Sequence, residues 1–172
     1  IYGALVTEKV RSMGAQFVNV NGEAFMHPLE TRDVAASGVI REVARGNGIH
    51  TPLRDGIWLD SPMIDAIHGE GTLEKRLPGM LRMYLRYDID MRKVPIVIYP
   101  TLHYQNGGVR VSVNGMSDVE NLYVAGEAAG GVHGRNRLMG NSLLDVIVFG
   151  RNAGQEAGKQ FKNCLLYTSP SP

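Results

Sequence analysis

Apolar and polar side chains alternate along part of the chain and follow a helical period elsewhere. Residues 17–26 alternate around Asn21-Gly22, which predicts a β-hairpin because Asn-Gly suits the tight turn between two strands. Thr31 to Arg45 has helical spacing, with Asp33 in the first turn, where a negative charge suits the helix dipole. Its predicted apolar stripe consists of Val34, Ile40, Val43 and Ala44.

The middle of the chain combines short strands and helices. Ile57 to Asp60 predicts a short strand, and the continuous β-branched stretch from Val94 to Tyr99 predicts a buried one. Between them, Thr72 to Tyr87 has a helical pattern that Pro78-Gly79 interrupts, so a new helix is expected to begin there. This order of elements predicts a mixed α and β structure.

The last third of the chain contains two predicted strands and the longest predicted helix. Val109 to Val113 alternates strictly and turns at Asn114-Gly115, and Asn121 to Gly126 is an apolar stretch that predicts a strand. Ser142 to Phe161 is the predicted helix, and its apolar run from Leu143 to Phe149 is expected to be buried.

Composition places the chain among soluble globular proteins and excludes several functions. The 172 residues are 44% hydrophobic and 20% charged, with a net charge of +1, so no whole-molecule field favours nucleic acid or an anionic membrane. No apolar run approaches the roughly 20 residues that span a bilayer, so no transmembrane segment is predicted. The single cysteine, Cys164, excludes an internal disulfide and a cysteine-based metal or iron–sulfur site.

Both ends of the sequence suggest a fragment. The chain opens on Ile1-Tyr2-Gly3, without an initiator methionine and within what looks like the interior of an element. Residues 163–172 have no periodicity and contain two Ser-Pro steps, so they are predicted to be a non-native or disordered tail and are excluded from fold reasoning.

Two segments carry groups that suit an anionic or hydroxylated ligand. Glu127 follows a predicted buried strand and precedes glycines, where its carboxylate could accept hydrogen bonds from ribityl or ribose hydroxyls; the alternative is a solvated glutamate in an ordinary turn. Asn141-Ser142 is a predicted helix cap, which leaves the N–H groups of Ser142, Leu143 and Leu144 free for an anion.

Four donor or cationic side chains and one carboxylate form a further candidate set. Arginine binds carboxylates through two parallel hydrogen bonds, so this set suits a small dicarboxylate. Each member also has an ordinary interpretation, for example an i,i+3 ion pair between Glu8 and Arg11 at a helix start, or a structural histidine after a strand. The set consists of Thr7, Glu8, Arg32, His103 and Arg137.

Six motifs follow one another along the chain. The longest and most specific is His133-Gly-Arg-Asn-Arg-Leu-Met-Gly-Asn-Ser-Leu-Leu-Asp145. The others are Leu5-Val-Thr-Glu8, Thr31-Arg-Asp-Val34, Gly56-Ile-Trp-Leu-Asp60, His103-Tyr104 with Gly107-Gly108, and Asn121-Leu-Tyr-Val-Ala-Gly-Glu127. In this order the chain resembles the flavoprotein subunit of fumarate reductase and succinate dehydrogenase, a family that includes L-aspartate oxidase. It departs from the family pattern at Gln105-Asn106, which leaves the subfamily open.

The resemblance implies an α/β fold made of two parts. Residues 1–97 are expected to form part of an α+β capping domain, and residues 98–162 the returning, C-terminal half of a Rossmann-like FAD-binding domain. The N-terminal half, with its glycine-rich dinucleotide fingerprint, is not in this sequence. The chain is therefore interpreted as the middle piece of a longer protein.

The resemblance also implies roles for individual residues. Arg32 is expected to donate or accept the proton while flavin N5 exchanges hydride with the substrate, and Glu8 and Arg11 to relay that proton. An arginine holds its proton too firmly for this role unless a neighbouring carboxylate returns it at once. The resemblance implies that substrate carboxylates are held by Thr7, His103 and Arg137, and FAD by Glu127, Asn141, Ser142 and Leu143.

The implied function is an FAD-dependent oxidoreductase that interconverts fumarate and succinate. Its implied partners are a C4 dicarboxylate, a quinone or other electron carrier and an iron–sulfur subunit, with no nucleic acid and no metal bound by this chain. The implied location is cytoplasmic, peripheral at the membrane through partner subunits. L-aspartate oxidase is the alternative enzyme, and a non-catalytic fragment without the N-terminal FAD fingerprint is the alternative of another class.

Overall fold

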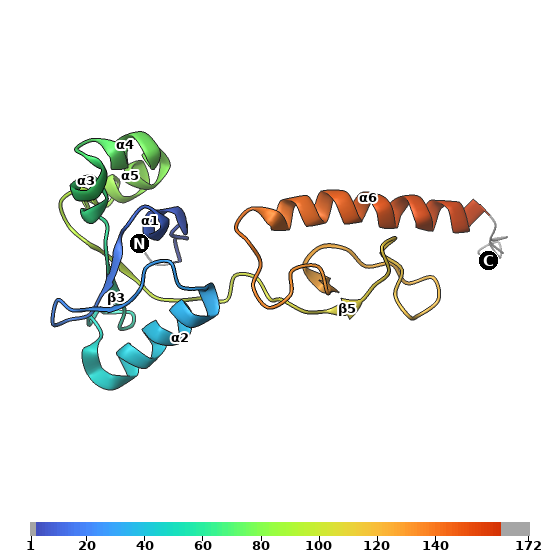
Figure 1. The fold of residues 1–172 in the computed structure, drawn as a ribbon, viewed down its shortest axis with the longest axis horizontal. Helices are drawn as coiled ribbons and strands as arrows, with labels where there is room; N and C mark the ends of the chain where they lie inside the picture. The colour runs from blue at the N-terminus through green and yellow to red at the C-terminus, as the bar shows by residue number, and fades with distance from the viewer. Residues whose placement is uncertain (1–2, 163–172) are drawn as a thin grey trace, which may run out of the picture. The chain divides into compact units, whose positions relative to one another are not determined.

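The computed structural model describes residues 3–162 and divides the chain into two compact units, Ile1–Thr101 and Leu102–Pro172 (Figure 1). The first unit combines a small sheet with short helices, and the second consists mainly of loops, a short sheet and one long helix. The tail predicted at residues 163–172 lies outside the described residues.

The first unit is built on a four-stranded antiparallel sheet in the order β2-β1-β3-β4. Phe17 pairs with Leu59, and Leu59 pairs with Ile96, so one file of apolar side chains crosses the sheet. The predicted hairpin and the predicted strand at residues 57–60 are confirmed, and the strand predicted at residues 94–99 is shorter. The strands are β1 (Gln16–Val18), β2 (Ala24–Met26), β3 (Ile57–Asp60) and β4 (Ile96–Ile98).

Short helices connect and cover these strands. The predicted helix after Thr31 is confirmed, and Gly46, with a φ of 85°, ends it in the left-handed conformation that favours glycine. Pro78 is the first residue of α5, where its missing N–H would have had no helical partner. The helices are α1 (Lys9–Ser12), α2 (Arg32–Glu42), which continues into η1 (Val43–Asn47), α3 (Met63–His68), α4 (Thr72–Arg76) and α5 (Pro78–Leu85).

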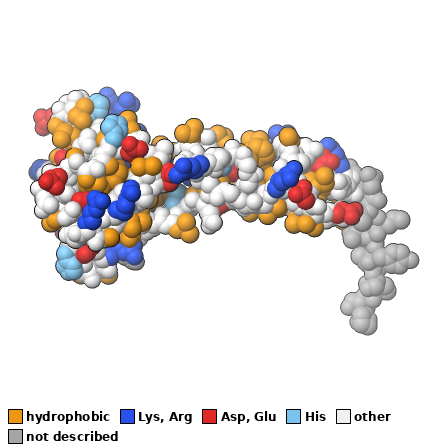
Figure 2. Space-filling model, turned by 60° about the horizontal axis from the view of Figure 1, so that its bottom comes forward, with side chains coloured by type: hydrophobic (Ala, Val, Ile, Leu, Met, Phe, Trp, Pro, Cys, Tyr) orange, Lys and Arg blue, Asp and Glu red, His pale blue; other side chains and the backbone are white. Residues whose placement is uncertain are grey.

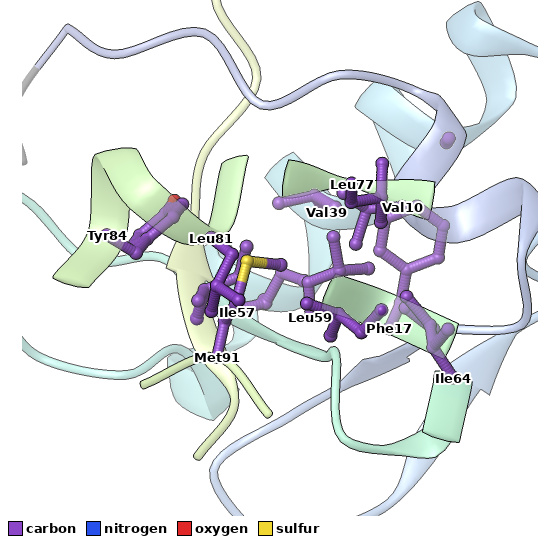
Figure 3. Packing of buried hydrophobic residues seen from close by; sticks show 14 residues of the cluster. Val10, Phe17, Val39, Ile57, Leu59, Ile64, Leu77, Leu81, Tyr84 and Met91 are labelled. Carbon is purple, nitrogen blue, oxygen red and sulfur yellow. The ribbon is translucent and has the colours of Figure 1, made fainter. Parts of the chain in front are cut away.

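The hydrophobic core of the first unit lies between the sheet and these helices (Figure 3). Burial alternates along β3, where Ile57 and Leu59 are buried and their neighbours are half-buried, as expected for a strand with one face on the core. The core side chains labelled in Figure 3 are Val10, Phe17, Val39, Ile57, Leu59, Ile64, Leu77, Leu81, Tyr84 and Met91.

The apolar stripe predicted on α2 is wrong. Val34 and Ile40 are exposed, and the helix buries Ala35, Val39 and Glu42 instead. These three residues follow one another at intervals of four and three, so they lie on one face of the helix. The packing thus selected a face that contains one charged side chain and only two apolar ones.

Hydrogen bonds satisfy the buried carboxylate of Glu42. Its Oε1 accepts bonds from the Nδ2 atoms of Asn19 at 3.0 Å and Asn47 at 2.8 Å. These two bonds lower the pKa of Glu42 below its ordinary value, with help from Arg45, although burial acts in the opposite direction. Because Asn19 directly follows β1, this network ties the end of α2 to the β1–β2 hairpin.

The second unit contains a two-stranded parallel pairing and a 22-residue helix. The strand predicted at residues 109–113 is regular only over Val109–Arg110, and Val111 then forms an isolated antiparallel bridge with Ser117. The helix predicted at residues 142–161 is confirmed. The elements are β5 (Val109–Arg110), the 3-10 turn η2 (Gly126–Ala128), β6 (Ala129–Gly130) and α6 (Asn141–Lys162).

The strand predicted at residues 121–126 does not form as a regular strand among the described residues. Tyr123 makes one isolated bridge with Met116, and the parallel pairing with β5 falls later, at Ala129 and Gly130. The reason is local, because Asn121 and Gly126 have φ values of 62° and 75° and interrupt the extended conformation at both ends of the stretch.

The apolar run of α6 is exposed, which is contrary to the prediction. Leu143 and Ile147 are 70% and 66% exposed, and their apolar neighbours also lie at the surface of the second unit, where Figure 2 shows hydrophobic side chains in orange. The helix packs through another face, on which Asp145 and Ala153 are buried. Within residues 3–162, no helix is both long and apolar enough to span a membrane.

Candidate active site

The carboxylate of Glu8 lies between two arginines in the first unit. Its Oε1 accepts a hydrogen bond from Arg11 Nη2 at 2.5 Å, and its Oε2 accepts one from Arg32 Nε at 2.7 Å and lies 2.5 Å from Arg32 Nη2. The i,i+3 ion pair between Glu8 and Arg11 is therefore present, as its ordinary interpretation expected, and α2 adds Arg32 to it. The structure brings the three predicted catalytic side chains into one cluster.

The backbone around this cluster fixes Arg11 and leaves Arg32 more accessible. Glu8 directly precedes α1, and Arg32 is the first residue of α2. Arg11 Nη1 donates to the carbonyl oxygens of Pro28, at 3.0 Å, and Glu30, in the loop that leads to α2. The Arg11 side chain is 11% exposed and that of Arg32 is 35% exposed. Arg32 is thus the arginine of the pair that can reach a ligand.

Electrostatics keeps Glu8 ionised. Partial burial raises the pKa of Glu8, but the hydrogen bonds and positive charges of Arg32 and Arg11 outweigh it, and the net pKa lies below the ordinary value. At neutral pH the cluster is therefore one carboxylate shared by two guanidinium groups, with a net charge of +1 for these three side chains.

Thr7 precedes the cluster and takes part in the start of α1. Its Oγ1 accepts a hydrogen bond from the backbone N–H of Lys9 at 3.4 Å, and its carbonyl oxygen accepts one from Val10. The hydroxyl hydrogen of Thr7 is not used in the bond to Lys9, because oxygen is the acceptor there. Thr7 can therefore donate to a ligand next to Glu8.

A second cluster, in the second unit, surrounds the buried side chains of Arg137 and Asp145. The guanidinium carbon of Arg137 lies 4.3 Å from the centre of the Tyr104 ring, and Arg137 Nη1 donates to the carbonyl oxygen of Leu138 at 3.0 Å. Tyr104 donates its hydroxyl to Asp145 Oδ2 at 3.3 Å, and the same oxygen lies 3.2 Å from His133 Nε2. We call Tyr104, His133, Arg137 and Asp145 the aromatic–arginine cluster.

His103 and Glu127 lie at the surface of the second unit. No hydrogen bond or ion pair joins His103 to Arg137 within residues 3–162, so the predicted pair is not in direct contact there. Glu127 Oε1 accepts the backbone N–H of Gln105 at 3.0 Å, which leaves its other oxygen for a ligand. A pocket of about 450 Å³ lies beside it, lined by Gln105, Asn106, Gly107, Gly108, Glu127 and Ala128.

Glycine shapes this pocket. Gly108 has a φ of 142°, and a Cβ at this position would lie 2.2 Å from the carbonyl oxygen of Ala128. A Cβ at Gly130 would lie 2.8 Å from the carbonyl oxygen of Gly108. The two backbone segments therefore approach so closely that only glycine fits, and the pocket wall is bare backbone.

The start of α6 differs in detail from the predicted cap. The helix begins at Asn141, and the N–H of Leu143 donates to the carbonyl oxygen of Gly140 at 3.3 Å, so it is not wholly free for an anion. That bond is long, and the helix dipole still gives this end a partial positive charge. Asn141 and Ser142 are half-buried.

Sequence reasoning assigned no role to Tyr104, His133 or Asp145, although all three lie in quoted motifs. A single sequence carries little signal for them, because a tyrosine after a histidine and an acid in an apolar helix are both commonplace. Their contact with one another joins residues up to 41 positions apart. The sequence-predicted residues thus divide into Thr7, Glu8, Arg11 and Arg32 in the first unit and His103, Glu127, Arg137 and Asn141–Leu143 in the second.

The residues of the second unit fit part of FAD. A carboxylate with a free oxygen borders a pocket walled by glycine backbone, which suits polyhydroxylated chains, and a helix N-terminus suits an anionic ring edge.

Comparison with known proteins agrees with this fit. The profile of the FAD binding domain family matches residues 1–143. One of the proteins that make up the CoM/CoB fumarate reductase of Methanothermobacter marburgensis is 42% identical to the chain, covering 91% of the chain and 28% of that protein. The succinate dehydrogenase flavoprotein subunit of Coxiella burnetii is 36% identical, covering 99% and 31%.

An oxidase and a solved structure extend the comparison. The L-aspartate oxidase of Clostridium perfringens is 35% identical, covering 94% of the chain and 35% of that protein. A solved quinol-fumarate reductase with menaquinol matches with a TM-score of 0.80 and 32% identity, covering 97% of the chain and 32% of its own. The chain thus spans about a third of the length of the relatives that it matches.

Proposed function

The chain belongs to the FAD-binding family that includes the flavoprotein subunits of fumarate reductase and succinate dehydrogenase and L-aspartate oxidase, and on that premise we propose that its full-length protein interconverts fumarate and succinate. FAD is the cofactor. The observation that carries the proposal is the carboxylate of Glu8 held at 2.5–2.7 Å between Arg11 and Arg32.

The two units have different roles in this proposal. Residues 1–97 belong to the capping domain and bring the Glu8 cluster to the substrate, and residues 98–162 are the returning half of the FAD-binding domain. The α+β composition of the first unit and the glycine-walled pocket of the second support this division. The partners proposed for the full-length protein are a quinone or other electron carrier and an iron–sulfur subunit, at the cytoplasmic membrane.

Arg32 is the proton donor and acceptor at one substrate carbon. A guanidinium is too weak an acid to lose its proton for long, so a base must return the proton as soon as Arg32 gives it up. The lowered pKa of Glu8 keeps that carboxylate ionised, and its hydrogen bonds to Arg32 and Arg11 form a continuous path for the proton. Arg11, anchored by two backbone carbonyls, holds the path in place.

Arg137 binds one carboxylate of the substrate, together with His103, and Thr7 binds the other. Arg137 is buried, and among the described residues its Nε has no hydrogen-bond partner. A buried unpaired guanidinium nitrogen is costly, and a carboxylate ligand would satisfy it. Positive charge at the carboxylates also draws electrons from the double bond of fumarate, which favours its reduction.

The cofactor-binding residues act on a group that the other half of the domain must also hold. Glu127 accepts hydrogen bonds from the ribityl or ribose hydroxyls, and Asn141, Ser142 and Leu143 place the positive end of α6 at the flavin. When bound, the flavin of FAD supplies the two-electron chemistry by exchanging a hydride with the substrate carbon.

L-aspartate oxidase is the second candidate, because a relative with that name is 35% identical over nearly the whole chain. The Glu8 cluster and Arg137 suit both substrates, since each has two carboxylates. The two functions differ in the substrate that reduces the flavin, which an assay can separate. A third possibility is that the chain alone is a non-catalytic fragment, because it includes only half of the proposed FAD-binding domain.

The proposal can be tested by following bound flavin in the purified full-length protein. We expect fumarate to reoxidise the reduced flavin rapidly, and Arg32→Ala to abolish this reaction while flavin stays bound. Arg41→Ala is the matched control, because Arg41 lies on the same helix, is exposed, and donates only to the backbone of its own helix through Nε. If aspartate bleaches the flavin and fumarate does nothing, the oxidase is the function. An Arg32→Ala variant as fast as Arg41→Ala would refute the role of Arg32.

A further inference from the structure

The carboxylate of Asp145 is buried without a direct cationic partner. The side chain is 1% exposed, Oδ2 is bonded to Tyr104 and lies beside His133, and Oδ1 has no hydrogen-bond partner within residues 3–162. Burying a charge is costly unless other charges or hydrogen bonds compensate it. An asparagine could accept the same two bonds at lower cost, so the negative charge itself calls for an explanation.

The compensating charge is that of Arg137, and the Tyr104 ring lies between the two. The guanidinium stacks 4.3 Å from the ring centre, and the ring's hydroxyl points to the carboxylate. Burial, together with the charge and hydrogen bond of Asp145, raises the pKa of Tyr104, so the hydroxyl keeps its proton and donates it to the carboxylate. A phenol that donates to an anion has a more electron-rich ring, which attracts a cation more strongly.

This arrangement differs from a direct ion pair in one useful way. An aspartate bonded to Arg137 itself would occupy the edge of the guanidinium that binds carboxylates in pairs of hydrogen bonds. Here the ring contacts the face of the guanidinium, while the Nε atom on its edge is buried and unpaired. The charge of Asp145 thus holds Arg137 in place without competing with a ligand.

His133 closes the cluster on another side. Its ring meets that of Tyr104 edge-on, with centroids 5.9 Å apart and an angle of 74° between the planes. Its Nε2 shares the carboxylate oxygen with the Tyr104 hydroxyl. Tyr104 can therefore not rotate away from Arg137 without losing contacts with both partners.

We propose that Asp145 is a positioning residue that acts through the hydroxyl and ring of Tyr104 to hold the guanidinium face of Arg137, leaving its edge free for a substrate carboxylate. This rests on the proposed function, in which Arg137 binds that carboxylate. The role belongs to substrate affinity, since neither Asp145 nor Tyr104 is assigned to the proton path.

The test is a double-mutant cycle on the full-length holoprotein with malonate, a dicarboxylate that cannot be reduced. Its dissociation constant is read from the change in flavin absorbance and by calorimetry. Asp145→Asn and Tyr104→Phe are each expected to weaken malonate binding about tenfold, the scale of one cation–π contact. Because the two residues act in series, the double variant is expected to bind no more weakly than either single variant. The turnover number at saturating fumarate is expected to change less than the KM.

Tyr123→Phe is the matched control, because its buried hydroxyl has no hydrogen-bond partner in the described part of the chain. It is expected to leave malonate affinity unchanged. Additive losses in the double variant, or variants that lower the melting temperature but bind malonate as the parent does, would overturn the positioning role. If the parent itself binds neither malonate nor fumarate, the proposed function fails, and this inference fails with it.

Discussion

Replacing Glu8 by glutamine separates a proton relay from a simple structural clamp. Both carboxylate oxygens are in use, one toward Arg11 and one toward Arg32. Glutamine has only one acceptor oxygen, and its NH₂ group would face the other guanidinium donor to donor. Arg11 keeps its two backbone carbonyls, so Arg32 is the side chain expected to lose its partner.

Magnitudes decide between the two roles. Because Glu8 and Arg32 are partly exposed, the lost bonds are expected to lower the free energy of unfolding by only about 1–2 kcal/mol. Loss of a general acid–base group typically slows a reaction by about 10² to 10⁴ fold. A structural clamp would instead let Arg32 wander, at a cost nearer to tenfold, by the scale of one lost hydrogen bond.

The assay is fumarate-dependent reoxidation per mole of bound flavin, with urea unfolding measured on the same samples. Glu8→Asp is the companion variant, because it keeps the charge and shortens the side chain. We expect Glu8→Gln to lose at least a hundredfold in rate, on the acid–base scale, with flavin content unchanged, and Glu8→Asp to lose less. A Glu8→Gln protein that retains more than about a tenth of the parent rate would refute the relay by the same scale.

Two further changes test the fold around the sites. Glu42→Gln is expected to flatten the dependence of stability on pH: hydrogen bonds from Asn19 keep the pKa of Glu42 below its ordinary value, so the parent loses this stabilisation as the pH falls from about 4.3 through the lower folded pKa. Urea unfolding between about pH 3 and pH 6, on either side of that value, measures the effect, and parallel curves for parent and variant would contradict it. Gly108→Ala is expected to lower the flavin content of the purified full-length protein, since its Cβ would lie 2.2 Å from the carbonyl oxygen of Ala128; an unchanged ratio of flavin to protein absorbance would count against this close approach.

Local signals in the sequence predicted most of the elements. Asn21-Gly22 identified the β1–β2 hairpin, Pro78 marked the start of α5, and the apolar run at residues 57–60 matched β3. These signals succeed because turn geometry, capping and side-chain period act within a few residues. The same signals overestimated the strand at residues 121–126, where two left-handed residues interrupt an otherwise suitable pattern.

The sequence by itself determined the ordered motifs, and these identified the family and the candidate residues. Only the tertiary structure decided which of them touch. Glu8 meets Arg32 across 24 positions, and Tyr104 meets Asp145 across 41. The face that α2 buries, with Glu42 in place of the expected valines, was likewise decided by packing. Contacts between distant residues depend on strand register and on which helix face meets the sheet, and those are properties of the packed chain that no local propensity encodes.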